Sequence, residues 1–264
     1  ALINSLNIVS IKLLREVGID KAQNYVQNFG YKKSRLPSDL SLALGSGNFS
    51  PIEMVRAFSV IANGGYLIDP YYISKIEDRN GNIIYSHKDF LNLVDIKEIT
   101  AFPWLDTLEM NIKKPYFLIE PLFKGDKVID ERIAFLTNDV LKEFMTKGTA
   151  GRKAAILNRK DIGGKTGTTN DATSTWFSGY ASNIVASAWV GKDDGTSLGD
   201  NEFGSTTALP IWVDYMNSAF KKIDVDEFAL PDGISYVRIN KKTGELSKSA
   251  EDESYFELFL SEDL

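Results

Sequence analysis

The run Gly163-Gly164-Lys165-Thr166-Gly167-Thr168 combines a lysine, two threonines and three glycines, and it is the sharpest chemical signal in the sequence. One interpretation is a phosphate-binding loop of the form Gly-x-x-x-x-Gly-Lys-Thr, in which backbone amides and a helix N-terminus hold the phosphate. The first glycine of that pattern would fall at Arg159, and the following segment Thr175–Tyr180 is typical of a strand. The pattern therefore disfavours a phosphate site.

The alternative interpretation is an edge strand that binds a carboxylate. The Lys165 ammonium and the hydroxyls of Thr166 and Thr168 would form a positive, hydroxyl-rich clamp, which the terminal carboxylate of a peptide needs. Gly167 has no side chain and leaves room for a ligand to approach the strand. A second Lys-Thr-Gly begins at Lys242, but the glutamate that follows it would repel a carboxylate, and we interpret that copy as a turn.

The first motif resembles the Lys-Thr-Gly-Thr motif of penicillin-recognising serine transpeptidases. Other stretches, in the same order along the chain, are similar to segments of class A penicillin-binding proteins: Ser5–Asn7, Gly45–Met54, Ala62–Tyr66, Thr146–Arg152 and Trp176–Tyr180. The resemblance covers residues 1–85 and 130–222. Ser5-Leu6-Asn7 taken alone would be an ordinary helix cap, but in this company it resembles the family's Ser-x-Asn motif.

The family's nucleophile is the serine of a Ser-x-x-Lys motif that precedes Ser-x-Asn. The one Ser-x-x-Lys in this sequence is Ser218-Ala219-Phe220-Lys221, which follows the Lys-Thr-Gly-Thr motif instead. Because this order is wrong, we interpret Ser218 and Lys221 as incidental residues of a C-terminal helix that packs on the sheet. We expect the nucleophile to lie outside this chain, upstream or in a companion chain. The sequence itself starts without a methionine or a signal-like segment and reads as a piece of a longer protein.

The resemblance implies acyl transfer, in which the missing serine attacks the D-Ala–D-Ala bond of a peptidoglycan stem peptide and a second stem peptide's amine resolves the ester. It implies that Ser5 and Asn7 pass a proton to the leaving amine and orient the substrate, with Lys165 supporting that relay. Thr166, Gly167 and Thr168 would bind the substrate carboxylate or a β-lactam, and the backbone N–H of Thr168 would form half of an oxyanion hole.

Two other functions remain open. One is a β-lactamase-type hydrolase on the same fold, which would release the penicilloyl group within seconds. The other is a non-catalytic binding module that kept the cleft and lost the nucleophile. The resemblance also implies the remaining parts of such a protein: a Ser-x-x-Lys segment, a glycosyltransferase domain and a membrane anchor, at the periplasmic side of the bacterial inner membrane.

Composition excludes several other classes of site. The chain has no cysteine and a single histidine, His87, so zinc, haem-thiolate and iron–sulfur sites lose most of their ligands. A cysteine nucleophile is impossible, and a Ser-His-Asp triad would depend on His87, which lies in a polar segment and is expected to be a solvated loop residue. We therefore expect no metal and no cofactor.

The charge of the chain is unevenly distributed. The whole chain carries −6, whereas residues 224–264 hold eleven acidic and four basic side chains, a net of −7, so residues 1–223 carry +1. Neither part shows a basic stripe, which disfavours a nucleic-acid partner. No apolar run reaches the eighteen residues of a membrane-spanning helix.

Periodicity and cap signals predict the elements that must position the motifs. Helices are predicted at 8–17, 20–29, 130–147 and 207–222, and another starts at the capping-box sequence Ser50-Pro51-Ile52-Glu53. Strands are predicted at 162–169, 175–181 and 184–191. Hairpins are predicted around Asn80-Gly81 and after 236–239. We predict an α+β fold of the β-lactamase-like transpeptidase type, an antiparallel sheet covered by helices on both faces and incomplete at its N-terminal side. Its domains would be a partial transpeptidase domain at 1–223, with an insertion at about 86–129, and an acidic extension at 224–264.

Overall fold

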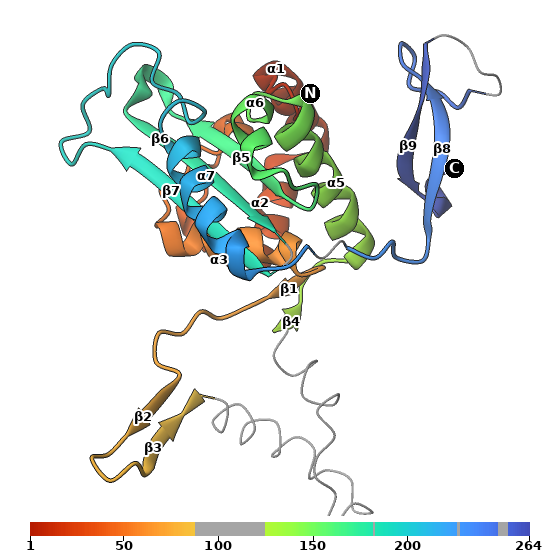
Figure 1. Cartoon of the computed structure of the whole chain (residues 1–264). Helices are drawn as coiled ribbons and strands as arrows, with labels where there is room; N and C mark the ends of the chain where they lie inside the picture. Colours follow the sequence, from red (N-terminus) through yellow and green to blue (C-terminus); the bar gives the residue numbers. More distant parts are fainter. Residues whose placement is uncertain (88–124, 182, 226–227, 248–252) are drawn as a thin grey trace, which may run out of the picture. The chain divides into compact units, whose positions relative to one another are not determined.

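The computed structural model describes residues 1–87, 125–181, 183–225, 228–247 and 253–264. The chain divides into two compact units, one formed by Ala1–Leu67 with Lys127–Leu264 and the other by Ile68–Asp126 (Figure 1). The two motifs singled out in the sequence lie in the first unit. Most of the predicted insertion, residues 88–124, lies outside the described residues.

The first unit is built on a three-stranded antiparallel sheet in the order β5 (Gly163–Thr168), β6 (Ser174–Ala181), β7 (Ile184–Gly191). All three strands match the predicted ones to within one residue at each end. Among the strands that the structure describes, β5 pairs with β6 alone in this sheet, so its other edge is unpaired within the described residues. The Lys-Thr-Gly-Thr motif therefore lies on an edge strand, as the sequence predicts.

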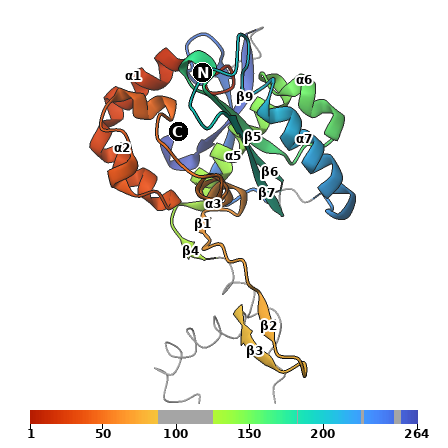
Figure 2. The same ribbon diagram turned by 90° about the vertical axis from the view of Figure 1, so that its left-hand side faces the viewer.

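Helices cover both faces of this sheet, as expected. Helices α3 (Pro51–Ala62) and α5 (Glu131–Lys147) pack on one face, and α6 (Gly151–Ala154) and α7 (Ala208–Ala219) lie on the other (Figure 2). The alternation of β6 explains this, because its successive side chains point to opposite faces. Tyr180 is fully buried and donates a hydrogen bond to Asn138 of α5 at 3.0 Å. The Phe177 ring packs 4.9 Å from the Trp212 ring of α7.

Three helix ends follow the predicted cap signals. In α3, Ser50 and Glu53 form the capping box, and α5 starts after Asp130, whose side chain accepts the N–H of Arg132. The first helix, α1 (Asn7–Val17), ends at Gly18, where φ is 89°. The helix predicted at 20–29 is α2 (Ile19–Val26) followed by a 3₁₀ turn. The 3₁₀ turns in the described residues are Gln27–Phe29, Lys33–Arg35, Leu40–Leu44, Ala155–Leu157, Asn170–Ala172, Phe220–Lys222 and Ser261–Asp263.

In the second unit, β2 (Lys75–Glu77) and β3 (Ile83–Ser86) form the predicted hairpin, with Gly81 in the turn at φ 83°. The prediction that His87 is a solvated loop residue is wrong. His87 is half-buried: its ring stacks on that of Tyr71 at 3.6 Å between centroids, and its Nδ1 lies 3.3 Å from the hydroxyl of Tyr85 in β3. Two short strands, β1 (Tyr66–Leu67) and β4 (Asp126–Lys127), pair with each other.

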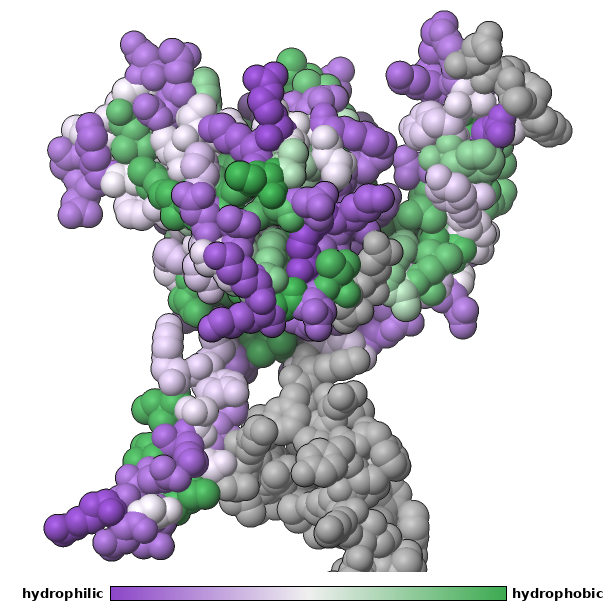
Figure 3. Space-filling view, viewed as in Figure 1, coloured by the Kyte–Doolittle hydropathy of each residue, from purple (hydrophilic) through white to green (hydrophobic). Residues whose placement is uncertain are grey.

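The acidic C-terminal segment forms an antiparallel hairpin of β8 (Ile234–Asn240) and β9 (Ser254–Leu260). The second Lys-Thr-Gly is a turn, as predicted: the Gly244 N–H donates to Asn240 O at 2.8 Å with φ at 74°, and Lys242 pairs with Glu253. Apolar residues also remain on the surface of the hairpin (Figure 3).

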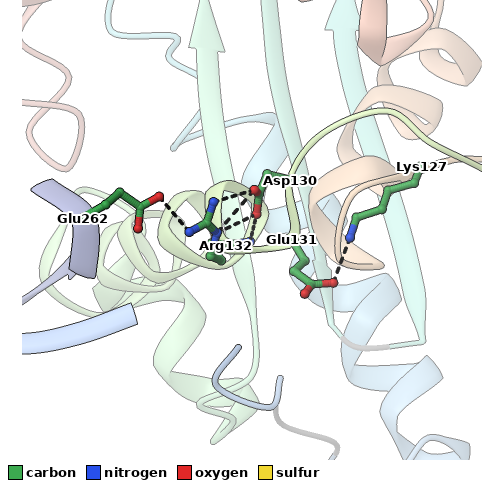
Figure 4. Close-up of polar contacts among 5 residues, drawn as sticks. All are labelled: Lys127, Asp130, Glu131, Arg132 and Glu262. Atoms are coloured by element: carbon green, nitrogen blue, oxygen red, sulfur yellow. Dashed lines mark hydrogen bonds and ion pairs between the residues drawn. The ribbon is translucent and has the colours of Figure 1, made fainter. Parts of the chain in front are cut away.

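Arg132, in the first turn of α5, joins this hairpin to the body of the unit. Its guanidinium pairs with the carboxylate of Asp130 at 2.8 Å and with that of Glu262 at 2.7 Å (Figure 4). The hydrogen bonds from Arg132 lower the pKa of Asp130 to about 2. Over the described ranges, no helix is both long and apolar enough to span a bilayer.

Candidate active site

The structure brings Ser5 and Lys165 together although they are 160 residues apart in the sequence. The Lys165 ammonium donates a hydrogen bond to the Ser5 hydroxyl, with an Nζ–Oγ distance of 2.6 Å. Ser5 lies in a turn in which its own N–H donates to Leu2 O and the N–H of Leu6 donates to Ala1 O. Its φ of 52° is in the left-handed region, which costs a non-glycine residue roughly 1–2 kcal/mol. Such strain at a polar residue is typical of functional sites.

Lys165 is a partly buried cation without a carboxylate partner in the described part of the chain. Its Nζ lies 4.5 Å from the centre of the Phe144 ring, which is completely buried in α5, and it also approaches Thr166 O at 3.3 Å. Burial lowers the pKa of Lys165 to about 8. An ammonium with this pKa can exchange a proton near neutral pH with the hydroxyl that it touches.

The threonines of the motif lie on the other face of β5. Because side chains alternate along a strand, Thr166 and Thr168 point away from the face that carries Lys165. On β5, Lys165 therefore lies on one face and the two threonines lie on the other. Thr168 is exposed, and its hydroxyl accepts a hydrogen bond from the Gly204 N–H at 2.9 Å.

The backbone of β5 also presents a donor at this edge. The N–H of Thr169 donates toward β6, to Ser174 O at 3.0 Å. Since neighbouring N–H groups of a strand point to opposite sides, the N–H of Thr168 points to the open edge. Gly167 lies opposite Trp176, and a Cβ at Gly167 would lie 3.3 Å from that of Trp176.

The remaining predicted residues lie apart from this contact. Asn7 is the exposed first residue of α1, and within the described ranges no hydrogen bond joins its side chain to Ser5 or Lys165. Ser218 and Lys221 are exposed at the end of α7 and in the 3₁₀ turn that follows it. The interpretation of that segment as a C-terminal helix on the sheet is confirmed.

Three residues of the site carry no signal of their own in the sequence. Phe144 belongs to the apolar stripe of α5 and looks like ordinary core, and Gly204 looks like a loop glycine. Gly148 looks like a helix terminator, but a Cβ there would lie 2.8 Å from Ile3 O, in the turn that carries Ser5. In the part of the chain that the structure describes, no three His, Asp or Glu side chains are grouped so as to hold a metal ion.

Comparison with known proteins identifies the family. The family model for the penicillin binding protein transpeptidase domain matches residues 1–198. Penicillin-binding protein 1A of Pseudomonas aeruginosa is 39% identical over 282 residues, covering 100% of this chain and 34% of that protein. The protein of the same name from Vibrio cholerae is 38% identical, covering 98% of this chain and 33% of its own length.

Solved structures agree with this. Penicillin-binding protein 1A from Haemophilus influenzae superimposes with a TM-score of 0.81 at 32% identity, over 98% of this chain and 39% of that one. PonA1 from Mycobacterium tuberculosis, at 19% identity and a TM-score of 0.59, shares the fold over 83% of this chain. The chain thus spans about a third of the length of the curated relatives. From the family match and these relatives, the chain belongs to the penicillin-binding protein transpeptidase domain family.

Proposed function

We propose that this chain supplies part of the active site of a D,D-transpeptidase that cross-links peptidoglycan stem peptides and is acylated by β-lactams. The observation that carries the proposal is the contact between the Ser5 hydroxyl and the Lys165 ammonium, in a chain of this family. Ser5, Asn7 and Lys165 are the proposed catalytic residues. Thr166, Gly167 and Thr168 are the proposed substrate-binding and β-lactam-binding residues.

In the proposed first step, the serine of a Ser-x-x-Lys segment outside this chain attacks the carbonyl of the D-Ala–D-Ala bond. The attacking serine gives its proton to the lysine of that segment, a carbon–oxygen bond forms, the carbon–nitrogen bond breaks, and a proton must reach the leaving amine. Ser5 passes that proton from Lys165, whose pKa of about 8 leaves it protonated at neutral pH yet able to donate. In the second step, the amine of another stem peptide attacks the ester, and the proton that it loses returns through Ser5 to Lys165. The lysine of the Ser-x-x-Lys segment gives its proton back to the released serine.

The open edge of β5 would hold the reacting groups in place. The outward N–H of Thr168 would donate to the oxyanion, and one such donor contributes about 3 kcal/mol of transition-state stabilisation. The threonine hydroxyls would donate to the substrate carboxylate, in the positive field of Lys165. Asn7, at the start of α1, would orient the substrate amide once substrate is bound.

The partners follow from the same proposal. The substrates would be peptidoglycan stem peptides and β-lactams, and the rest of the protein would carry the Ser-x-x-Lys segment, a glycosyltransferase domain and a membrane anchor. This places the reaction at the periplasmic side of the bacterial inner membrane. No metal or cofactor takes part in the proposed steps.

Labelled penicillin tests this proposal. Residues 1–264 alone should form no covalent adduct, because the proposed nucleophile lies outside them. In the longer protein that also contains Ser-x-x-Lys, Lys165→Ala should abolish most acylation, since it removes the cation that contacts Ser5. The matched control Lys242→Ala changes the exposed second Lys-Thr-Gly and should have no effect.

Four results would contradict the proposal. An adduct on residues 1–264 alone, at Ser218 for example, would place the nucleophile inside this chain. Equal losses from the two lysine substitutions would mean that Lys165 has no special role. Release of the penicilloyl group within seconds would identify a β-lactamase-type hydrolase, whereas the lack of acylation of the longer protein would identify a binding module.

A further inference from the structure

Gly204 lies in the loop that leads into α7 and touches the Lys-Thr-Gly-Thr motif directly. Its N–H donates a hydrogen bond to the Thr168 hydroxyl oxygen at 2.9 Å. A hydroxyl has one proton to donate and lone pairs to accept with. Because Gly204 occupies the oxygen as an acceptor, the proton of the Thr168 hydroxyl is directed elsewhere. Among the described residues, no acceptor takes that proton.

The backbone at Gly204 approaches β5 and β6 too closely for any other residue. Gly204 is buried, and a Cβ there would lie 2.4 Å from Trp176 O and 2.6 Å from Gly167 O. Both are backbone atoms of paired strands, which cannot move aside without disturbing the sheet. Any side chain at position 204 would therefore clash with the sheet. Because glycine has none, the backbone can lie close enough for its N–H to reach the Thr168 hydroxyl.

The loop is held in this position from several sides. Gly204 O accepts the N–H of Leu209, in the first turn of α7, at 2.8 Å, and Ser205 O accepts from the Lys153 ammonium at 2.6 Å. The hydroxyl of Thr207 lies 2.6 Å from that of Thr175, a fully buried residue of β6. The Gly204 N–H is thus a fixed donor rather than part of a loose loop.

From this geometry we infer that Gly204 is a positioning residue, which fixes the Thr168 hydroxyl as a hydrogen-bond donor and so makes the site select ligands that end in a carboxylate. The inference rests on the proposed function, in which the edge of β5 binds the substrate's carboxylate. A carboxylate can only accept hydrogen bonds. A Thr168 hydroxyl free to rotate would present its lone pairs part of the time and would repel the carboxylate.

Acylation by a matched pair of ligands tests the inference in the longer protein that contains Ser-x-x-Lys. The pair is a penicillin and its carboxyl methyl ester, and the readout is the ratio of their acylation rate constants. Thr168→Val should lower this ratio about tenfold, as expected for the loss of a hydrogen bond to a charged group. Gly204→Ala should lower the ratio to a similar extent, and the double variant should show no further loss, because both changes remove one interaction. Ser205→Ala, which keeps the loop backbone, is the control and should leave the ratio unchanged.

The outcomes separate the inference from the proposed function. If Thr168→Val leaves the ratio unchanged, the carboxylate clamp of the proposed function is wrong. If Thr168→Val lowers the ratio but Gly204→Ala does not, or if the two effects add, the inference about Gly204 is wrong. The proposed binding of the carboxylate by Thr168 would still be supported. A loss of rate with both ligands alike would indicate a purely structural role for Gly204 and would also overturn the inference.

Hydrogen exchange of the Gly204 amide covers the case in which Gly204→Ala does not fold. In the protein with the natural Gly204, exchange of this amide should become faster with Thr168→Val and stay slow with Thr168→Ser, which keeps the acceptor. The penicillin should slow this exchange more than its methyl ester does. Equal exchange in the two variants, or with the two ligands, would overturn the inference.

Discussion

At the scale of single residues, the site depends on a lysine that has no carboxylate partner in the described part of the chain. A neighbouring carboxylate would raise the pKa of Lys165 and hold its proton, whereas the Phe144 ring attracts the ammonium without accepting a proton. Burial then lowers the pKa to about 8. Burial of the Lys165 ammonium lowers the stability of the folded chain, and it also makes Lys165 a group that can transfer a proton near neutral pH.

This arrangement predicts how stability depends on pH. The pKa of Lys165 is about 8 in the folded chain and near 10.5 in the unfolded chain. Between these values the unfolded state binds more protons, so the contribution of Lys165 to the free energy of unfolding increases as the pH rises through this window. Lys165→Met should remove that increase, as measured by urea denaturation at pH 7.5 and pH 10 (about the two ends of the window). Lys242→Met, at an exposed lysine, should keep it; loss of the increase in both variants would refute this account of Lys165.

At the scale of elements, the sequence predicts most of the scaffold and only part of the site. Alternation and caps are local signals, so they locate the three strands of the sheet and helices such as α3 and α5. The contact of Ser5 with Lys165 joins segments 160 residues apart, and a left-handed turn at a serine has no local signal. Motif order suggests this pair, and alternation along the predicted strand places Thr168 on the face opposite Lys165. Neither signal predicts the support from Phe144 and Gly204.

Gly148, which ends α5, lies against the turn that carries Ser5. Its φ of −89° suits any residue, so glycine is needed there only for space: a Cβ would lie 2.7 Å from Phe144 O and 2.8 Å from Ile3 O. Gly148→Ala should push the turn that carries Ser5 away from α5 and destabilise the fold by roughly 1–3 kcal/mol. Urea denaturation measures the stability, and penicillin acylation of the longer protein, expected to fall, measures the effect on the site. Thr149→Ala, at the exposed neighbouring residue, should change neither quantity, and wild-type acylation of Gly148→Ala would show that the turn tolerates the Cβ.

At the scale of the whole molecule, the described part of the acidic segment 224–264 has regular structure. Its two strands form a hairpin, and Glu262 beyond β9 pairs with Arg132 at the start of α5 (Figure 4). Two-stranded hairpins are marginally stable alone in water. The order of β8 and β9 therefore depends in part on attachment to the body of the first unit, and Arg132 provides an electrostatic part of that attachment.

Hydrogen exchange can measure this attachment. Glu262→Gln removes the charge that pairs with Arg132 but leaves the Arg132–Asp130 pair and therefore the cap of α5. An exposed ion pair contributes up to about 1 kcal/mol, so amides of β8 and β9 should exchange up to about fivefold faster, while those of the central sheet keep their rates. Because exposed pairs are screened, high salt should reduce the difference. Asp263→Asn removes one negative charge from the adjacent residue and should have little effect. Equal acceleration in the two variants would mean that total charge, rather than the pair with Arg132, holds the hairpin in place.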